Sequence, residues 1–346
     1  MRGNSDMEKK KTSRFSRQGV LRFFGNNVIM ICMLVLIVAI AIIEPRFMSV
    51  RVLRDILIQN SSRMIIACGM AMVLISGGMD LSAGRIVGLA AVITGSLGQM
   101  AESNSRFFPN LPQLPPFVPL LVAIAVCFVF GMFNGVAIAK FSIPPFIVTL
   151  GTGMIIWGVN LLYYDIEPNN SQPIGGIQKG IKNMGSGYIA NTVPVIIVIA
   201  LAVVLISWFI MKYTKFGRDI YSIGGNRDAA EVCGIRVERT LIKTYAIAAI
   251  TFAIGGFLEC AHTNGATAAY GENYEFDVIA ACVVGGVSNS GGVGTIPGMV
   301  LGVLMFGIIN YGLTFLGVQP YWQKIVKGII ILTAVGFDVR KNIRRK

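Results

Sequence analysis

The sequence predicts an all-α protein that crosses a lipid bilayer with about ten helices. Of its 346 residues, 54% are hydrophobic and only 14% are charged, whereas soluble domains contain about 25% charged residues. The apolar residues also form long runs, with the charged residues concentrated between them. These two observations exclude a disordered chain, a coiled coil and a disulfide scaffold, and they argue against a soluble enzyme.

Ten apolar runs are candidate membrane spans, and the first covers 28–43. Ala39-Ile40-Ala41 is similar to a signal-peptide cleavage site, but the long polar lead and the bulky Ile42-Ile43 favour a retained anchor. Glycines interrupt several of the later runs, which makes their ends uncertain. The other nine runs lie near 58–77, 82–98, 117–139, 144–164, 192–211, 244–261, 276–290, 296–316 and 323–338.

The basic residues predict the orientation of the spans. Most of the 30 Lys and Arg side chains fall within 1–26, 212–243 and 340–346. Cytoplasmic segments beside membrane spans carry such an excess of positive charge. We therefore expect both termini and 212–243 to be cytoplasmic, with 99–116 and 165–190 outside. The exception is the loop at 44–57, where this topology places Arg46, Arg51 and Arg54 outside.

The same pattern divides the chain into a basic cytoplasmic lead (1–26), a single transmembrane domain (27–343) and a short cytoplasmic tail (344–346). It also argues against a nucleic-acid partner, because a nucleic-acid binder gathers its positive charge on one face or groove. The lipid bilayer is the expected environment.

Metal and nucleotide chemistry are not expected on this chain. The six cysteines form no C-x-x-C pair, and His262 is the only histidine, so no metal site is predicted. No G-x-x-x-x-G-K-[ST] motif occurs, which argues against a Walker-type nucleotide site. We predict no catalytic residue and no cofactor bound to this chain.

An internal repeat is also indicated. Gly131-x-x-Asn134 recurs as Gly307-x-x-Asn310, and Pro144 recurs as Pro320, at one constant offset of 176 residues. Gly77-Gly78 has a looser counterpart in Gly285-Gly286. Since the offset covers five spans, the repeat predicts two five-helix halves of inverted topology, an arrangement typical of transporters. Chance matches in a glycine-rich chain are the alternative.

Two glycine-rich segments break the apolar pattern. In 77–85, Asp80 or Ser82 is suited to cap the following helix, and a direct role in a transport path is the alternative. In 285–298 the irregular backbone must be covered by protein or line a cavity. This second segment is a candidate for the path or for a hinge.

The cytoplasmic segment 212–243 predicts a short helix outside the membrane. Asn226 is a good N-cap, Asp228 adds negative charge to the first turn, and Gly234 is a good C-terminal stop. A helix of about two turns is marginal alone and needs something to pack on. The residues themselves leave open whether it docks on a soluble partner or only connects two spans.

Three motifs together resemble the permease subunits of bacterial sugar ABC importers, in the ribose/galactose branch. The resemblance covers about residues 28–340, and within the branch it is strongest to the galactose/methylgalactoside group. Its motifs are Gly78-x-Asp80-Leu81-Ser82-x-Gly84, Phe216-Gly217-Arg218-x-x-Tyr221-x-Ile223-Gly224-Gly225-Asn226-x-x-Ala229-Ala230-x-x-x-Gly234-Ile235, and Tyr274-Glu275-Phe276-Asp277-x-Ile279-Ala280-Ala281 followed by Gly285-Gly286-Val287-Ser288. Phe276 stands where the family usually has leucine.

The resemblance implies a mechanism and partners. Such permeases lie in the bacterial inner membrane and work as two copies. They receive the sugar from a periplasmic sugar-binding protein, and a cytoplasmic ABC ATPase that holds ATP and magnesium drives them. The implied cargo is galactose or methylgalactoside; ribose, another monosaccharide or a nucleoside is the alternative. The implied ATPase-coupling helix comprises Gly225, Asn226, Ala229, Ala230 and Gly234.

Sugar hydroxyls need hydrogen bonds along a path, and aromatic faces suit pyranose rings. The candidate path residues in the spans are therefore Asn134, Asn160, Tyr163, Tyr164, Asn310 and Trp322. Each has a structural alternative, namely an interhelical hydrogen bond for an asparagine and an interfacial position for an aromatic residue. An ion-coupled carrier is the rival class, and its charge relay would depend on Asp80, Glu259, Asp277 and Lys327.

Overall fold

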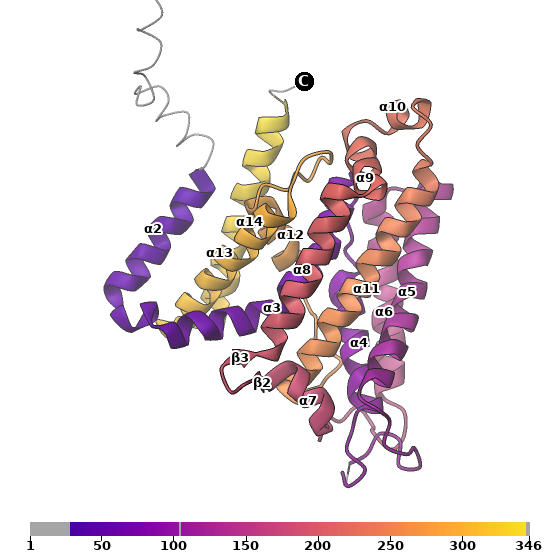
Figure 1. Ribbon diagram of the computed structural model, residues 1–346, viewed down its shortest axis with the longest axis vertical. Helices are drawn as coiled ribbons and strands as arrows, with labels where there is room; N and C mark the ends of the chain where they lie inside the picture. Colours follow the sequence, from indigo (N-terminus) through magenta and orange to yellow (C-terminus); the bar gives the residue numbers. More distant parts are fainter. Residues whose placement is uncertain (1–27, 104, 344–346) are drawn as a thin grey trace, which may run out of the picture.

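The computed structural model describes residues 28–103 and 105–343, and its main elements are helices (Figure 1). The lead at 1–26 and the tail at 344–346 lie outside the described residues. Every predicted apolar run corresponds to a helix, which confirms the all-α prediction. The first five are α2 (Val28–Ile43), α3 (Val50–Ile75), α4 (Ala83–Leu97), α5 (Phe117–Lys140) and α6 (Pro145–Tyr164). The second five are α8 (Val195–Tyr213), α11 (Val237–Thr263), α12 (Tyr274–Val284), α13 (Ile296–Phe315) and α14 (Pro320–Ile343).

The helices differ in how far they can cross a bilayer. Within the described part of the chain, six are long and apolar enough to span it: α3, α5, α6, α8, α11 and α13. The helix α4 has 15 residues and α12 only 11, short of the roughly 20 that a span needs. The run expected at 276–290 ends at Val284 because a glycine pair follows, with φ +86° at Gly286.

Smaller elements cap the two ends of the molecule. At one end lie α9 (Lys215–Gly225) and α10 (Arg227–Val232), together with the start of α2 and the end of α14 (Figure 1). At the other end lie α7 (Lys179–Ser186) and the hairpin of β2 (Tyr188–Ile189) and β3 (Val193–Pro194). A second antiparallel pair joins β1 (Ile174–Gly175) to β4 (Gly265–Ala266), and η2 (Pro45–Met48) leads into α3.

The packing of the helices follows an internal two-fold pattern. In the first half α4 packs on α5 and α6, and in the second α12 packs on α13 and α14. Between the halves, α5 and α4 pack on α11 in the way that α13 and α12 pack on α3. The helices thus correspond one to one in chain order, from α2 with α8 to α6 with α14. This correspondence supports the predicted five-helix halves.

The glycine of the repeated motif allows close helix packing in both halves. A Cβ on Gly131 of α5 would lie 2.7 Å from the carbonyl oxygen of Tyr245 on α11, and one on Gly307 of α13 would lie 2.2 Å from the amide of Asn60 on α3. Each glycine therefore allows its helix to approach the long helix of the other half. The glycine pairs are not equivalent, because Gly77-Gly78 precedes the short α4 whereas Gly285-Gly286 follows the short α12.

One helix departs from the two-fold pattern. The helix α8 packs on α3, whereas its counterpart α2 packs on α13 and stands apart from the main bundle (Figure 1). Large apolar side chains on α5, α6 and α8 are exposed, including Phe133, Leu162 and Leu205. An apolar surface of this extent on a helical bundle is suited to lipid rather than to water.

Candidate coupling element and transport path

The helix α10 is short, but both of its ends are capped. The Asn226 side chain accepts a hydrogen bond from the backbone N–H of Ala229 at 2.9 Å, so the predicted N-cap is present. At the other end Gly234 has φ +81°. The backbone N–H of Ile235 donates to the carbonyl of Ala230 at 3.1 Å, which closes the helix in the way glycine stops commonly do.

The two faces of α10 have different surroundings. Ala230 is buried in a small apolar cluster with Ile223, Val237, Leu241 and Ala139. The rest of α10 is exposed, and Val232 has 89% of its surface accessible. A helix of six residues is thus held in place by one buried alanine while it presents a nearly complete outer surface. The proposed residues Gly225, Asn226, Ala229 and Gly234 lie on the exposed side.

The helix α9 precedes α10 and was not expected from the sequence. Thr214 caps its start by accepting from the N–H of Gly217 at 3.1 Å. Near its end, a Cβ on Gly224 would lie 1.8 Å from the carbonyl oxygen of Ile75, the last residue of α3. The same oxygen accepts a 2.9 Å hydrogen bond from the N–H of Gly292. The end of α9 therefore meets the end of α3 and the loop that leads into α13.

A tyrosine strengthens this junction. The hydroxyl of Tyr221 on α9 donates to the carbonyl of Gly294 at 2.8 Å. Burial raises the pKa of Tyr221 above its ordinary value, so the hydroxyl stays protonated and keeps donating. The junction of Gly224, Ile75, Gly292 and Tyr221 joins the α9–α10 segment to both halves of the molecule at once.

The break between α3 and α4 is held by polar side chains. The carboxylate of Asp80 accepts from the backbone N–H and the hydroxyl of Ser82, at 2.9 and 2.5 Å. Ser82 stands at the N-cap of α4 but makes no capping bond with its side chain. The amide of Asn134 donates to the hydroxyl of Ser82 at 3.0 Å, and Thr149 accepts from the N–H of Leu81 at 3.0 Å. Asp80 thus fixes a completely buried turn.

The candidate path residues of the first half occupy packed positions. Asn134 is completely buried in the Asp80 turn. Asn160 is also buried, and its amide lies 3.5 Å from the carbonyl of Ala268. Tyr163 shares a 2.6 Å hydrogen bond with Ser96 and packs on the ring of Phe107. Tyr164 lies in the same apolar cluster as Phe107.

The two candidates of the second half lie differently. Asn310 lines a cavity of about 470 Å³ between α3, α13 and α14. Trp322 is 62% exposed and is not part of that lining. Residues that the sequence reasoning did not single out complete the cavity, among them Gln59, Arg63 and Tyr311. An i, i+4 row of Gln59 and Arg63 on one face of a span is the signal that could have found them.

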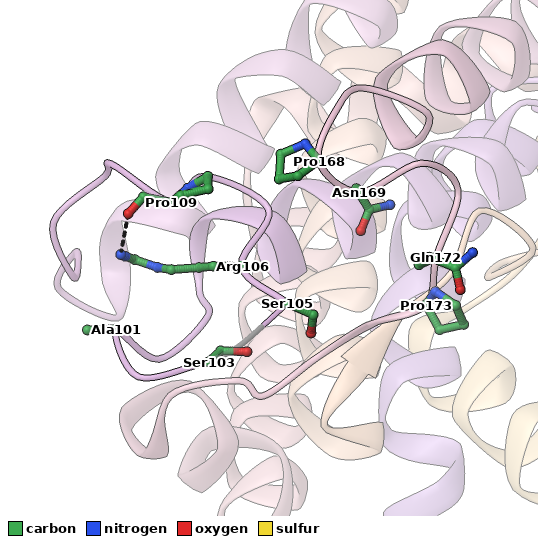
Figure 2. A pocket seen from close by; sticks show the side chains of 9 residues that line it. All are labelled: Ala101, Ser103, Ser105, Arg106, Pro109, Pro168, Asn169, Gln172 and Pro173. Atoms are coloured by element: carbon green, nitrogen blue, oxygen red, sulfur yellow. Dashed lines mark hydrogen bonds between the residues drawn. The ribbon is translucent and has the colours of Figure 1, made fainter.

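A second hollow of about 460 Å³ lies at the end of the molecule opposite α10. Figure 2 shows that it opens between two loops, which follow α4 and α6. The guanidinium of Arg106 donates to the carbonyl of Pro109 at its edge, at 3.4 Å. Its lining residues are Ala101, Ser103, Ser105, Arg106, Pro109, Pro168, Asn169, Gln172 and Pro173.

Comparisons with known proteins agree with this geometry. A family described as branched-chain amino acid transport system / permease component matches residues 52–335. The chain is 42% identical over 337 residues to the galactose/methyl galactoside import permease protein of Escherichia coli, which covers 96% of this chain and 100% of that protein. It is 35% identical over 308 residues to the ribose import permease protein of Bacillus subtilis, covering 89% and 91%. No solved structure matches the chain.

Proposed function

Since the chain belongs to the branched-chain amino acid transport system / permease component family, in its branch of sugar import permeases, we propose that it moves galactose or methylgalactoside into the cell. The identity to galactose permeases (42%) exceeds that to ribose permeases (35%) over nearly the whole chain, and this difference favours galactose over ribose as cargo. The chain works in the bacterial inner membrane with both termini in the cytoplasm.

In this proposal two copies of the chain pair, and a periplasmic sugar-binding protein delivers the sugar to the end that carries α7 and the outer loops. A separate ABC ATPase binds the opposite end and supplies the energy from ATP and magnesium. The observation that carries the proposal is α10, because a short helix with two capped ends and an exposed outer face is suited to fill a groove on a soluble partner.

Coupling then follows from the contacts of the cytoplasmic segment. When the ATPase moves α10, the cluster around Ala230 carries the movement into α9 and the start of α11. The junction at Gly224 passes it to the end of α3 and to the loop before α13. Since α3 and α13 pack on each other, a shift at this junction changes the packing between the two halves, as alternating access requires.

The burial of Ala230 determines which residue tests the docking. Ala230 is buried, so a bulky charged side chain at this position would displace α10 from the apolar cluster that holds it. A loss of transport would then not distinguish a docking defect from a folding defect. Val232 is exposed, so a substitution there does not disturb this packing. We expect Val232→Glu to abolish co-purification of the ATPase and to lower ATP-driven galactose uptake roughly tenfold or more, because a carboxylate at the centre of an interface must be desolvated.

The measurement uses proteoliposomes that contain this chain, the ATPase and the galactose-binding protein, with ATP on the cytoplasmic side. Val232→Thr, similar in shape, is the matched control and should keep uptake. Uptake that follows an ion gradient without ATP would replace the proposal with an ion-coupled carrier. Uptake of ribose but not galactose, each with its own binding protein, would keep the importer and correct the cargo.

A further inference from the structure

We propose that the cavity between α3, α13 and α14 is a sugar-binding station on the transport path; this inference rests on the proposed function. The cavity measures about 470 Å³, within the range of about 300–1,000 Å³ that small-molecule sites occupy. It lies along the second half of α13, and α13 begins beside α9. The cavity is therefore on the side of the membrane away from α10, where the sugar enters.

The two halves differ at one repeated position beside the cavity. At the offset of 176 residues, Gly135 of α5 corresponds to Tyr311 of α13. A Cβ on Gly135 would lie 2.7 Å from the Cα of Ile242, so α5 rests directly on α11. The phenol ring of Tyr311 occupies this position on α13 and lines the cavity. At this position α5 and α11 of the first pair are in direct contact, whereas α13 and α3 of the second pair leave room for the cavity.

The lining provides the groups that a sugar needs. Gln59 and Asn310 line the cavity with amide side chains, which both donate to and accept from hydroxyl groups. The amide nitrogens of Asn60 and Gln323 already donate to the carbonyls of Ile56 and Val318. The buried Oδ1 of Asn310 and Nε of Arg63 make no hydrogen bond to the described residues. An unpaired buried polar atom is costly, and a hydroxyl-rich ligand can supply the missing partners for both.

Aromatic rings also line the cavity. The rings of Tyr311 and Phe315 are stacked with their centroids 6.1 Å apart, and Phe47 packs edge-on against Phe315 at 5.9 Å. Tyr311 and Phe315 both line the cavity. A lining that combines aromatic rings with amide groups suits a pyranose, which has one face of C–H groups and a rim of hydroxyls.

The charges around the cavity suit a neutral cargo. The ammonium of Lys327 lies 2.9 Å from the carboxylate of Asp277. The guanidinium of Arg63 lies 5.2 Å above the ring of Tyr274, whose hydroxyl donates to Glu259 at 2.8 Å. Lys327 therefore has a carboxylate partner, whereas no described carboxylate lies within 4 Å of Arg63, which packs on an aromatic ring. A neutral sugar can accept hydrogen bonds from Arg63 and leaves the Lys327–Asp277 ion pair intact.

Filling the cavity tests the assignment. Thr314 is exposed within it, and Thr333 is an exposed threonine of α14 outside it. We expect Thr314→Trp to lower galactose uptake roughly tenfold or more, because an indole takes the space of the ring, while Thr333→Trp leaves uptake unchanged. Asn310→Leu, which replaces the amide with an apolar group of similar branching, should lower maximal uptake about threefold to tenfold through lost hydrogen bonds.

The second readout is the ATPase activity that the loaded binding protein stimulates in the same complexes. It should persist in Thr314→Trp, because partner contacts lie elsewhere. Normal uptake by Thr314→Trp would overturn the assignment. If Thr314→Trp lost stimulated ATPase activity together with uptake, the variant would have a structural defect, and normal uptake by Asn310→Leu would then overturn the assignment. No ATP-dependent uptake of galactose or ribose by the unaltered chain would instead overturn the proposed function, and this assignment with it.

Discussion

At the scale of single residues, glycines decide how closely the helices approach one another. Gly131 lets α5 contact the backbone of α11, where a Cβ would lie 2.4 Å from the Cβ of Ala249. Gly158 of α6, in contrast, has no atom within 4 Å of the position a Cβ would take. The same substitution therefore has opposite consequences at the two positions.

We expect Gly131→Ala to destabilise the protein by about 1–3 kcal/mol, because two helix backbones must separate. Gly158→Ala should be neutral or stabilising by up to about 1 kcal/mol, since alanine is the better helix former. Thermal unfolding in detergent, followed by tryptophan fluorescence, measures both variants. Equal melting temperatures for the two would show that the α5–α11 contact is looser than the structure has it.

The repeat also shows what single residues could and could not predict. Asn134 and Asn310 occupy the same place in the repeated motif, and both are predicted from the sequence as path residues on equal grounds. Asn134 is completely buried and bonded to Ser82, whereas Asn310 lines a cavity. Their surroundings depend on the neighbouring Gly135 and Tyr311 and on the opposing helix, and no local pattern contains that tertiary information.

At the scale of elements, α9 links α10 to the membrane-spanning helices. Gly224 and Gly225 are adjacent, but only Gly224 is pressed against another helix, since a Cβ there would lie 1.8 Å from the carbonyl oxygen of Ile75. Gly225 has no atom within 4 Å of its Cβ position. Alanine substitutions at these two neighbouring glycines therefore distinguish a disturbed junction from the mere addition of a methyl group to α9.

Gly224→Ala should shift α9 away from α3 and lower ATP-driven uptake, while the ATPase still co-purifies because α10 remains capped and exposed. Gly225→Ala should retain uptake. The readout is the number of sugar molecules moved per ATP hydrolysed, and we expect Gly224→Ala to lower that ratio by roughly tenfold, as disturbed positioning of a coupled element does. An unchanged ratio would remove the junction from the coupling route.

Helices with long apolar runs were predicted well from the sequence. Helices whose formation depends on tertiary contacts were predicted poorly. All ten runs became helices, and the Asn226 cap and Gly234 stop of α10 follow from local backbone chemistry. The helix α9 was missed because its buried residues Ile220 and Ile223 lie within a polar segment. Its stability comes from packing on α3 and α8, and a short helix of this kind has little intrinsic stability.

At the scale of the whole molecule, the start of α2, the end of α14 and the α9–α10 segment share one side (Figure 1). This arrangement predicts which sites a membrane-impermeant maleimide reaches. Among the cysteines whose side chains the structure describes, Cys233 beside α10 is the exposed one. Lys182 on α7 is exposed at the opposite end, so a cysteine there should be accessible from outside.

We expect Lys182→Cys to be labelled in intact cells stripped of their outer membrane, and Cys233 only after permeabilisation. In the Cys233→Ser variant, the labelling that appears after permeabilisation should disappear. This control shows that Cys233 is the residue labelled. Labelling of Cys233 in intact cells would invert the proposed topology. An inverted topology would also place Arg46, Arg51 and Arg54 in the cytoplasm, whereas the proposed one leaves them outside as the exception to the charge pattern.

The two halves of the chain repeat one arrangement of five helices. Residues in one half can therefore change while the other half maintains the fold. Gly131 and Gly135 bring α5 into direct contact with α11, whereas a cavity lined by side chains of α3, α13 and α14 lies beside the equivalent contact of α13 with α3. In the proposed assignment, substitutions along this lining alter which solute is accepted while the α5–α11 contact maintains the fold. Relatives with different cargoes should differ most along this lining and least along α5 and α11.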